Sequence, residues 1–415
     1  MTGDLPGFAD VVIVGAGPAG LAAAAELKAR GVGSVLVLER EAQAGGIPRH
    51  CGHFPFGMRE FHRLLRGPAY AARLLARAQA AGAVIKTGVT VTALHPGPGL
   101  SVASAGGLRQ ITARRVLLCT GVRESTRAAR LIGGTKPGGV LSTGALQGMV
   151  HLQALRPFRN PVVLGTELVS FSALLTCRHL GIRPAAMIEP GPRVTARRPA
   201  GLLPRLLGVP LLRNTSITAI EGRDRVTGVS LQAADGARRR IACDGLIVTG
   251  DFRPEAALLR DSHLAMDPAT GGPVVDQFGH CSDPAYFAAG NLLRPVETAG
   301  WSWNEGRIIG RVIAESLGDD VPNLAQYMKI DPQGYVLKYI LPQTVSASPA
   351  PAALRHFQLR VTRPARGRLI LRVNGKVVLS RALSALPERR ITLPLNALPA
   401  GVEGMAEVSF EEGPA

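Results

Sequence analysis

Three glycines near the N-terminus have the spacing of a phosphate-binding turn. The segment GAGPAG, residues 15–20, matches the pattern Gly-x-Gly-x-x-Gly. In such a turn Gly15 permits a tight reversal after a strand, Gly17 lets the backbone approach a pyrophosphate, and Gly20 allows close packing of helix on strand. The free backbone N–H groups and the positive end of the helix dipole then face the phosphates. The spacing therefore predicts a turn that binds a dinucleotide.

The residues around this turn predict the elements that hold it. Val11–Val14 is a short apolar, β-branched run typical of a buried parallel strand, and an Ala- and Leu-rich helical stretch continues to about Arg30. A second strand is expected over Ser34–Leu38, and Glu39 stands at its end. A carboxylate there can accept hydrogen bonds from both ribose hydroxyls of an adenosine. Because strand, glycines, helix, strand and acid occur in order, a chance glycine-rich turn is much the weaker explanation.

A second strand–helix–strand pattern begins at Asn160. After Gly165 its turn has Glu167 and Ser170 where the second and third glycines are expected. Glu167 would place a side chain and a negative charge where a pyrophosphate approaches, so the pattern does not establish NAD(P) binding. Two interpretations stay open: a domain kept for its fold, and a nicotinamide site, for which Glu189 would favour NAD over NADP.

Two later strand ends complete a pattern that resembles a known family. Residues 115–121 read RVLLCTG and residues 286–292 read YFAAGNL. With the first motif they resemble the glutathione-reductase-like FAD flavoproteins of the pyridine nucleotide-disulfide oxidoreductase superfamily, which have two dinucleotide-binding domains. That family places an Asp against the FAD ribityl chain where this chain has Asn291, and an Ala where it has Cys119. The resemblance also implies a helix beginning near Gly300 whose N-terminus faces the flavin pyrimidine edge.

The resemblance implies a cofactor and its binding residues. FAD is the expected cofactor, and NAD(P) stays uncertain because the second turn lacks its glycines. No metal is expected. The residues implied to bind FAD are Gly15, Ala16, Gly17, Pro18, Ala19, Gly20, Glu39, Arg40, Gly45, Gly46, Val91, Thr120, Gly121, Gly290, Asn291 and Gly300.

The segment 45–73 points to a subgroup of the family. Disulfide reductases carry a CxxxxC pair here, whereas this chain has only Cys51, so dithiol–disulfide chemistry is not expected. The segment resembles flavoprotein components of multi-subunit bacterial dehydrogenases: those accompanying glycerol-3-phosphate dehydrogenases and, more remotely, α-type subunits of opine and hydroxyproline dehydrogenases and of hydrogen cyanide synthase. The matching residues are Gly45, Gly46, Cys51, His53, Phe56, Gly57 and the run 67–71. The resemblance covers roughly residues 8–345, and the Cys-rich iron–sulfur domain of many opine-type subunits is absent.

His50, Cys51 and His53 form the one cluster of reactive side chains expected near the flavin. Cys51 and His53 are the candidate catalytic residues, as a proton donor, a flavin-tuning group or part of a substrate pocket. The alternative is that Cys51 packs and the histidines bond backbone carbonyls. Trp301 and Trp303, like Glu297, are expected to line a substrate pocket or a subunit interface, with core packing as the alternative for the tryptophans.

These patterns predict an α/β fold in three parts. A Rossmann-like FAD-binding domain is expected over 8–125 and 255–330, interrupted by an NAD(P)-binding-like domain over 126–254. A linker over 346–353 and a β-rich domain over 335–415 are expected at the C-terminus, with a hairpin at Asn374-Gly375. That domain carries no chemical motif, so docking to a partner subunit or a dimer mate is its expected role, and a β cap without a partner is the alternative.

Composition sets further bounds. The net charge is +18, but 42 arginines and six lysines are spread along the chain, so a compositional habit explains the charge better than a polyanion partner. Five cysteines without metal-ligand spacing, no basic-then-apolar leader and no long apolar run predict a cytoplasmic protein without a transmembrane segment.

Three functions remain after these exclusions. The leading hypothesis is an FAD-dependent dehydrogenase subunit that transfers electrons, with a partner subunit or a second copy of the chain, from a small polar metabolite. The alternative is a self-contained NAD(P)H-linked FAD oxidoreductase. A nucleic-acid-binding flavoprotein is the remote third, since only net charge supports it.

Overall fold

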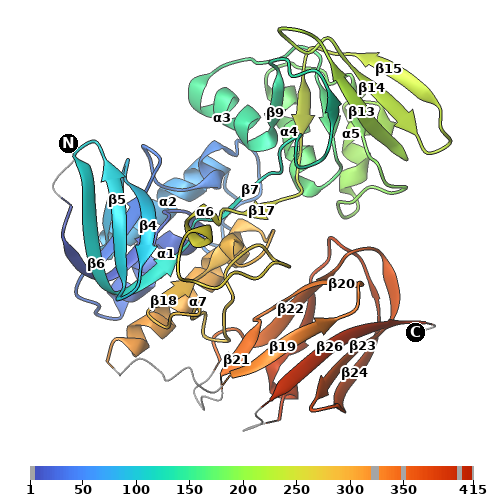
Figure 1. Ribbon diagram of the computed structural model, residues 1–415. Coiled ribbons are helices and arrows are strands. Elements are labelled where there is room, and N and C mark those ends of the chain that lie inside the picture. Colours follow the sequence, from blue (N-terminus) through green and yellow to red (C-terminus); the bar gives the residue numbers. More distant parts are fainter. Residues whose placement is uncertain (1–4, 319–326, 347–351, 400–403, 414–415) are drawn as a thin grey trace. The chain divides into compact units, whose positions relative to one another are not determined.

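The computed structural model describes residues 5–318, 327–346, 352–399 and 404–413, and the chain forms two compact units (Figure 1). The first unit comprises residues 1–46, 71–122 and 253–415, and the second comprises 47–70 and 123–252. The predicted insertion of one domain in another is therefore reproduced. The segment 47–70, expected in the FAD-binding domain, groups with the second unit instead. Among the described residues no helix is long and apolar enough to cross a bilayer.

The first unit is built on a mainly parallel sheet with the strand order β3-β2-β1-β6-β5-β4, and β18 pairs with β6. The strands that meet at the binding turn are all parallel neighbours, β2–β1–β6–β18, and their apolar residues are buried on both faces, as parallel strands require. The bounds are β1 (Phe8–Val14), β2 (Val35–Glu39), β3 (Val84–Thr87), β4 (Thr90–His95), β5 (Gly99–Ser104), β6 (Gly107–Leu118) and β18 (Tyr286–Ala288).

Helices α1 (Pro18–Ala29) and α7 (Ala299–Ser316) pack closely against each other. A Cβ atom at Gly306 would lie 2.1 Å from the carbonyl oxygen of Ala19, and one at Gly310 would lie 3.0 Å from the backbone of Ala23. The two glycines therefore let the helix backbones touch, which fixes the N-terminus of α7 beside that of α1. The remaining helices of this unit are α2 (Gly67–Ala80), which begins in the second unit, α6 (Ala257–Arg260) and the 3-10 turn η3 (Gly290–Leu292).

The second unit contains its own parallel sheet, in the order β12-β11-β10-β16-β9, and a smaller sheet, β15-β14-β13-β8. The parallel strands are β9 (Val140–Ser142), β10 (Val162–Leu164), β11 (Ala186–Ile188), β12 (Leu211–Leu212) and β16 (Leu246–Val248); the smaller sheet holds β8 (Gly133–Gly134), β13 (Thr215–Glu221), β14 (Gly228–Ala233) and β15 (Arg238–Ala242). The helices are η1 (Ile47–His50), α3 (Thr143–Gln153), α4 (Leu168–His179), η2 (Ala200–Leu202) and α5 (Leu203–Leu206). The chain passes between the units at β7 (Val122–Arg123) and β17 (Arg253–Pro254).

The C-terminal β domain, defined here as the described residues from 327 onward, has two sheets, β21-β19-β26-β23-β24 and β20-β22-β25, around one apolar core. Its strands are β19 (Tyr327–Gln333), β20 (Leu337–Leu341), β21 (Thr344–Ser346), β22 (His356–Val361), β23 (Ala365–Val373), β24 (Lys376–Ala385), β25 (Ile391–Pro394) and β26 (Met405–Glu412), with the 3-10 turn η4 (Leu395–Ala397). The hairpin at Asn374-Gly375 is confirmed, since Val373 pairs with Lys376 and both turn residues have positive φ. Strand β19 begins before the expected boundary at 335, and much of the expected linker lies outside the described residues.

Candidate functional site

The turn after β1 holds its three glycines for two different reasons. Gly15 has φ +105°, and a Cβ there would lie 2.5 Å from the carbonyl oxygen of Cys119. A Cβ at Gly20 would lie 2.0 Å from the carbonyl oxygen of Gly15, so the backbone itself excludes side chains at both positions. A Cβ at Gly17, in contrast, would meet nothing within 4 Å, and its φ of −81° is open to any residue. The fold does not require glycine at 17, so the open space beside it is suited to a ligand.

The N-terminus of α1 faces this open space without a side-chain cap. Gly17 is the N-cap residue, it makes no side-chain cap hydrogen bond, and Pro18 occupies the first helical position. The first-turn N–H groups and the helix dipole therefore present partial positive charge with no acidic side chain in the first turn. This environment fits the pyrophosphate of a dinucleotide.

Glu39 lies at the end of β2 and is buried, with 8% of its surface exposed. Its Oε2 accepts a hydrogen bond from the N–H of Ala16 at 3.0 Å, and its Oε1 accepts one from the N–H of Glu41 at 3.0 Å. Each carboxylate oxygen can accept a further bond, so the fixed carboxylate fits ribose hydroxyls. The neighbouring Arg40 side chain is exposed and lies 4.0 Å from Glu255.

Other predicted residues gather at the same end of the sheet. The N–H of Gly45 donates to the carbonyl of Ala16 at 2.8 Å, and a Cβ at Gly46 would lie 2.9 Å from Cα of Gly17. Gly121 has φ +77° and open space where a Cβ would lie. Because the carboxyl ends of β1, β6 and β18 meet at one sheet edge, the structure brings these turns together as the sequence predicted.

Three further predicted residues lie around this edge. The hydroxyl of Thr120 donates to the carbonyl of Glu255 at 2.7 Å. A Cβ at Gly290 would lie 2.8 Å from the Cβ of Ala19, which places the end of β18 against α1. Val91, on β4, is buried in the apolar core of the first unit.

Asn291 closes the loop that leads into α7. Its Nδ2 donates to the carbonyl of Glu297 at 3.0 Å, and its Oδ1 accepts from the N–H of Glu297 at 2.8 Å. A carboxylate could accept from that N–H but could not donate to that carbonyl, which gives a physical reason for Asn in place of Asp. The loop ends at Thr298, the N-cap of α7, which makes no side-chain cap bond, and Gly300 lies in the first turn.

A buried ion pair beneath this loop was missed by the sequence analysis. Arg294 is 2% exposed, and its Nη1 donates to Oε2 of Glu305 at 2.9 Å and to the carbonyl of Gly290 at 3.2 Å. The same Glu305 oxygen accepts from the N–H of Gly290 at 2.9 Å. Burial alone would lower the pKa of Arg294, but Glu305 outweighs it and the pKa is raised, so the guanidinium stays charged. The pair fixes Gly290 at the predicted flavin turn.

Cys51 lies in the second unit and is buried, with 7% of its surface exposed. Its sulfur lies 3.4 Å from the carbonyl of Ile47 and 3.5 Å from Oε1 of Gln147. Burial raises the pKa of the Cys51 thiol to about 12, with a smaller contribution from the charge of Glu124. The thiol is therefore neutral at physiological pH, which favours the packing interpretation over a nucleophile.

His53 is half-buried, and its Nδ1 lies 3.0 Å from the carbonyl oxygen of Phe54. The second unit adds His151, which the sequence analysis missed: a Cβ at Gly52 would lie 2.3 Å from its ring. The ring of His179 lies 5.3 Å from that of His151, centroid to centroid. Burial lowers the pKa of His151, as do the neighbouring His179 and His53, so these rings form a mutually repelling cationic group when protonated.

The two tryptophans lie in different environments. Trp301, in the first turn of α7, has the guanidinium of Arg390 4.0 Å from its ring centroid. Trp303 lines a small groove between α1, α2 and α7, with the guanidinium of Arg307 5.7 Å from its ring centroid. Neither position distinguishes a substrate pocket from a subunit interface.

The second binding-type turn, after β10, is closed by its own side chains. Glu167 is the N-cap of α4, and its Oε1 accepts from the N–H of Asp251 at 2.8 Å. Burial raises the pKa of Glu167, partly offset by the Asp251 hydrogen bond and the charge of Arg130. Ser170 is fully buried and shares a hydrogen bond with the hydroxyl of Thr249.

Glu189, at the end of β11, keeps the place of a ribose-binding acid. It is 7% exposed and accepts hydrogen bonds from the hydroxyl of Thr166 and, at 2.8 Å, from the N–H of Gly191. The structure thus retains the acid while Glu167 occupies the phosphate end of the turn.

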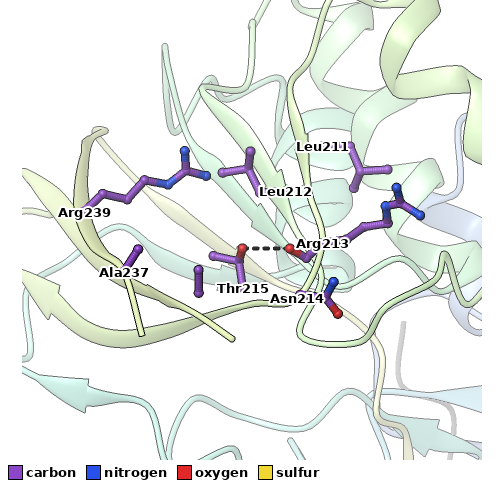
Figure 2. A pocket seen from close by; sticks show the side chains of 8 residues that line it. Leu211, Leu212, Arg213, Asn214, Thr215, Ala237 and Arg239 are labelled. Atoms are coloured by element: carbon purple, nitrogen blue, oxygen red, sulfur yellow. Dashed lines mark hydrogen bonds between the residues drawn. The ribbon is translucent and has the colours of Figure 1, made fainter. Parts of the chain in front are cut away.

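A cavity of about 430 Å³ lies elsewhere in the second unit, at the ends of β12 and the β14–β15 hairpin (Figure 2). The guanidinium groups of Arg213 and Arg239 border it and are exposed, and the hydroxyl of Thr215 donates to the carbonyl of Arg213 at 2.9 Å. The lining residues are Leu211, Leu212, Arg213, Asn214, Thr215, Ala233, Ala237 and Arg239. None of them belongs to a predicted site.

Among the described residues there is no group of three or more His, Cys, Asp or Glu side chains arranged to hold a metal ion. All five cysteines are free and buried.

Comparisons with known proteins give relatives that match this architecture. An opine oxidase component of Rhizobium meliloti (strain 1021), named as one of that enzyme's subunits, is 27% identical over 185 residues, which cover 43% of this chain and 38% of the relative. The alpha subunit of sarcosine oxidase from the same organism is 23% identical over 333 residues, covering 76% of this chain and 31% of the relative. The chain spans about a third of the length of these two curated relatives.

Solved structures show the same fold. Thioredoxin reductase of T. acidophilum has a TM-score of 0.65 at 22% identity, covering 76% of this chain and all of that one. Thioredoxin reductase of Lactococcus lactis has a TM-score of 0.60 at 18% identity, covering 75% of this chain and 99% of that one. The sequence profile of the pyridine nucleotide-disulphide oxidoreductase family matches residues 9–306. The chain therefore belongs to the pyridine nucleotide-disulphide oxidoreductase family, and it is an FAD-dependent oxidoreductase.

Proposed function

We propose that FAD is held at the carboxyl edge of the first unit's parallel sheet. The open space at Gly17 and Gly121, the uncapped N-terminus of α1 and the fixed carboxylate of Glu39 support this placement. There the bound flavin supplies the two-electron chemistry, and the protein supplies orientation and electrostatics. The proposed binding residues are those predicted from the sequence.

We further propose that the chain is the electron-transferring flavoprotein subunit of a multi-component dehydrogenase. The observation that carries this is the second turn, where the Glu167 carboxylate lies at the N-terminus of α4. A carboxylate at that position repels the pyrophosphate of NAD(P)H and occupies its place. With direct reduction by nicotinamide disfavoured, electrons have to enter from a substrate or a partner.

The comparisons support a partner and suggest a first substrate class. Two relatives are named as subunits of oxidases, and this chain corresponds to about a third of each. Their names contain opine and sarcosine, which are both N-substituted amino acids. We therefore propose a small polar metabolite as electron donor, with N-substituted amino acids as the first class to test.

His53 is the stronger of the two proposed catalytic residues. Its half-buried imidazole can exchange a proton near neutral pH, whereas the Cys51 thiol keeps its proton. The free thiols of the chain fit a reducing compartment, so the cytoplasm stays the proposed location.

The test is an anaerobic titration of purified holoprotein with NADH, NADPH, sarcosine and an opine, each followed by the flavin absorbance. The proposal predicts that neither nicotinamide bleaches the flavin, and that substrate-dependent dye reduction requires a second protein that copurifies with the chain. Rapid bleaching by NADH in the isolated chain would overturn it. That outcome would establish the alternative, a self-contained NAD(P)H-linked oxidoreductase, which the retained Glu189 favours.

A further inference from the structure

Three side chains of the C-terminal β domain lie against the loop that precedes α7. Tyr339 on β20 is the cross-strand partner of Arg360 on β22, and Arg390 directly precedes β25, which pairs with β22. The three come from neighbouring strands of one small sheet. This sheet therefore presents two guanidinium groups and a phenol together.

Both arginines contact Glu297. The Nη2 of Arg360 donates to the carbonyl of Val296 at 2.8 Å and lies 3.4 Å from Oε1 of Glu297. The Nη1 of Arg390 lies 3.6 Å from Oε2 of Glu297, and its guanidinium stacks on Trp301. The Glu297 side chain is 10% exposed and the two arginines are 15% and 18% exposed, so water screens these pairs less than surface pairs.

The backbone of Glu297 in turn holds Asn291. Both polar atoms of the Asn291 amide bond the N–H and carbonyl of Glu297. Asn291 directly follows Gly290, at the end of β18, and Thr298, directly after Glu297, caps α7. The contacts thus run without a break from the β domain to the two features of the loop expected to face the flavin.

Polar groups buried beneath the loop reinforce this interpretation. The hydroxyls of Tyr339 and Ser302 and the Nε of Arg294 are buried and have no hydrogen-bond partner among the described residues. An unpaired buried polar group costs stability, and such costs are typical of functional regions. Apolar packing would serve better if this surface only joined two domains.

We propose that the C-terminal β domain positions the flavin loop, with Glu297, Arg360 and Arg390 as the positioning residues. This gives the domain a role within the chain, independent of a partner subunit. The inference rests on the proposed FAD site, because it assumes that Asn291 and the N-terminus of α7 face the cofactor. The β domain becomes part of the binding site through contacts two residues removed from the ligand.

The test compares the full-length variants Glu297→Gln, Arg390→Gln and the double variant with the wild type. Each is measured for FAD dissociation, by rebinding FAD to apoprotein, and for the flavin midpoint potential. Each single variant is expected to weaken FAD binding by about tenfold and to shift the potential. The double variant is expected to be no weaker than the worse single variant, because both remove one interaction. Arg363→Gln is the matched control: it breaks an exposed ion pair with Glu412 in the same domain and should change neither quantity.

A second comparison separates the inference from the site assignment. Asn291→Ala should also weaken FAD binding if the loop faces the cofactor. If Asn291→Ala has this effect but the Glu297 and Arg390 variants bind FAD normally with an unchanged potential, the positioning role is refuted and the FAD site stands. If none of the three variants alters FAD binding or potential, both the site assignment and the inference are refuted. If a glutamine variant fails to fold, Arg390→Lys, which keeps the charge but removes the planar group over Trp301, serves in its place.

Discussion

Gly15 and Gly165 begin two strand–turn–helix–strand segments whose backbones correspond residue for residue. The two glycines have φ of +105° and +107°, and their N–H groups donate to Leu38 and Ile188 at 2.8 Å in each case. Each segment ends in a buried glutamate, Glu39 or Glu189, which accepts a hydrogen bond from the N–H two residues further on. The segments differ chiefly at the second and third glycine positions.

That difference separates what the fold needs from what a ligand needs. The first glycine is present in both turns because its backbone conformation excludes a side chain. At the second position the fold imposes no such demand, since a Cβ at Gly17 meets nothing within 4 Å and Glu167 fits at the equivalent place. Glycine at 17 is thus explained by the cofactor, and its replacement by Glu167 fits a turn released from that demand.

The largest effect is expected from transferring the second turn's residue into the first. Gly17→Glu places a carboxylate where the pyrophosphate is proposed to bind, and FAD affinity should fall by at least about 100-fold. The measurement is the flavin-to-protein ratio of the purified variant. Since the space at 17 is open, the apoprotein should keep its thermal stability, and Gly17→Ala is the control for side-chain volume. A yellow Gly17→Glu protein would refute the site.

The reverse exchange should have a smaller effect. Glu167→Gly removes the carboxylate at the N-terminus of α4, and NADH affinity should rise by about tenfold or more. Isothermal titration with NADH checks this, and Glu167→Gln, which removes the charge but keeps the side chain, separates repulsion from steric blocking. Unchanged NADH affinity in both variants would mean that Ser170 or the rest of the turn closes the site.

The pH dependence of stability should also distinguish the two segments. Because burial raises the folded-state pKa of Glu167, its ionisation opposes folding: its contribution is complete below the unfolded pKa and is lost as pH rises through the folded pKa. The wild type should therefore lose stability relative to Glu167→Gln over this window, upward from about pH 4.5. Chemical denaturation of both proteins between pH 4 and 7 measures the gap. A gap that stays constant would contradict a raised pKa.

The smallest effect is expected at Cys51. With a pKa of about 12 its thiol should react with iodoacetamide only very slowly at pH 8, and Cys51→Ala should change the FAD-dependent rate by no more than about twofold. Mass spectrometry of the labelled protein and dye-linked assays test the two statements. Rapid labelling of Cys51, or loss of activity in the variant, would restore a chemical role.

The local parts of this architecture could be predicted from sequence, and the long-range parts could not. The glycines of the first turn, Glu39 and the Asn374-Gly375 hairpin carry their signal within a few residues, and the structure has the corresponding elements. The damaged second turn was also visible, although the bond from Asp251 to Glu167 spans 84 residues and was not.

The residues that were missed act through partners remote in sequence. Arg360 and Arg390 contact Glu297 from another domain, and nothing in their local sequence distinguishes them from the other arginines. His151 reaches Gly52 across about a hundred residues. A basic chain with 42 arginines hides such functional ones, because composition alone accounts for most of them.

The central claim is that this chain has one working dinucleotide site and one that its own carboxylate closes. The most direct test is the visible spectrum of the purified protein, recorded anaerobically before and after a stoichiometric addition of NADH. The account predicts flavin bands that persist with NADH and disappear with dithionite. Flavin bands that bleach with NADH would contradict the closed second site, and purified protein without flavin bands that also fails to bind added FAD would contradict the first.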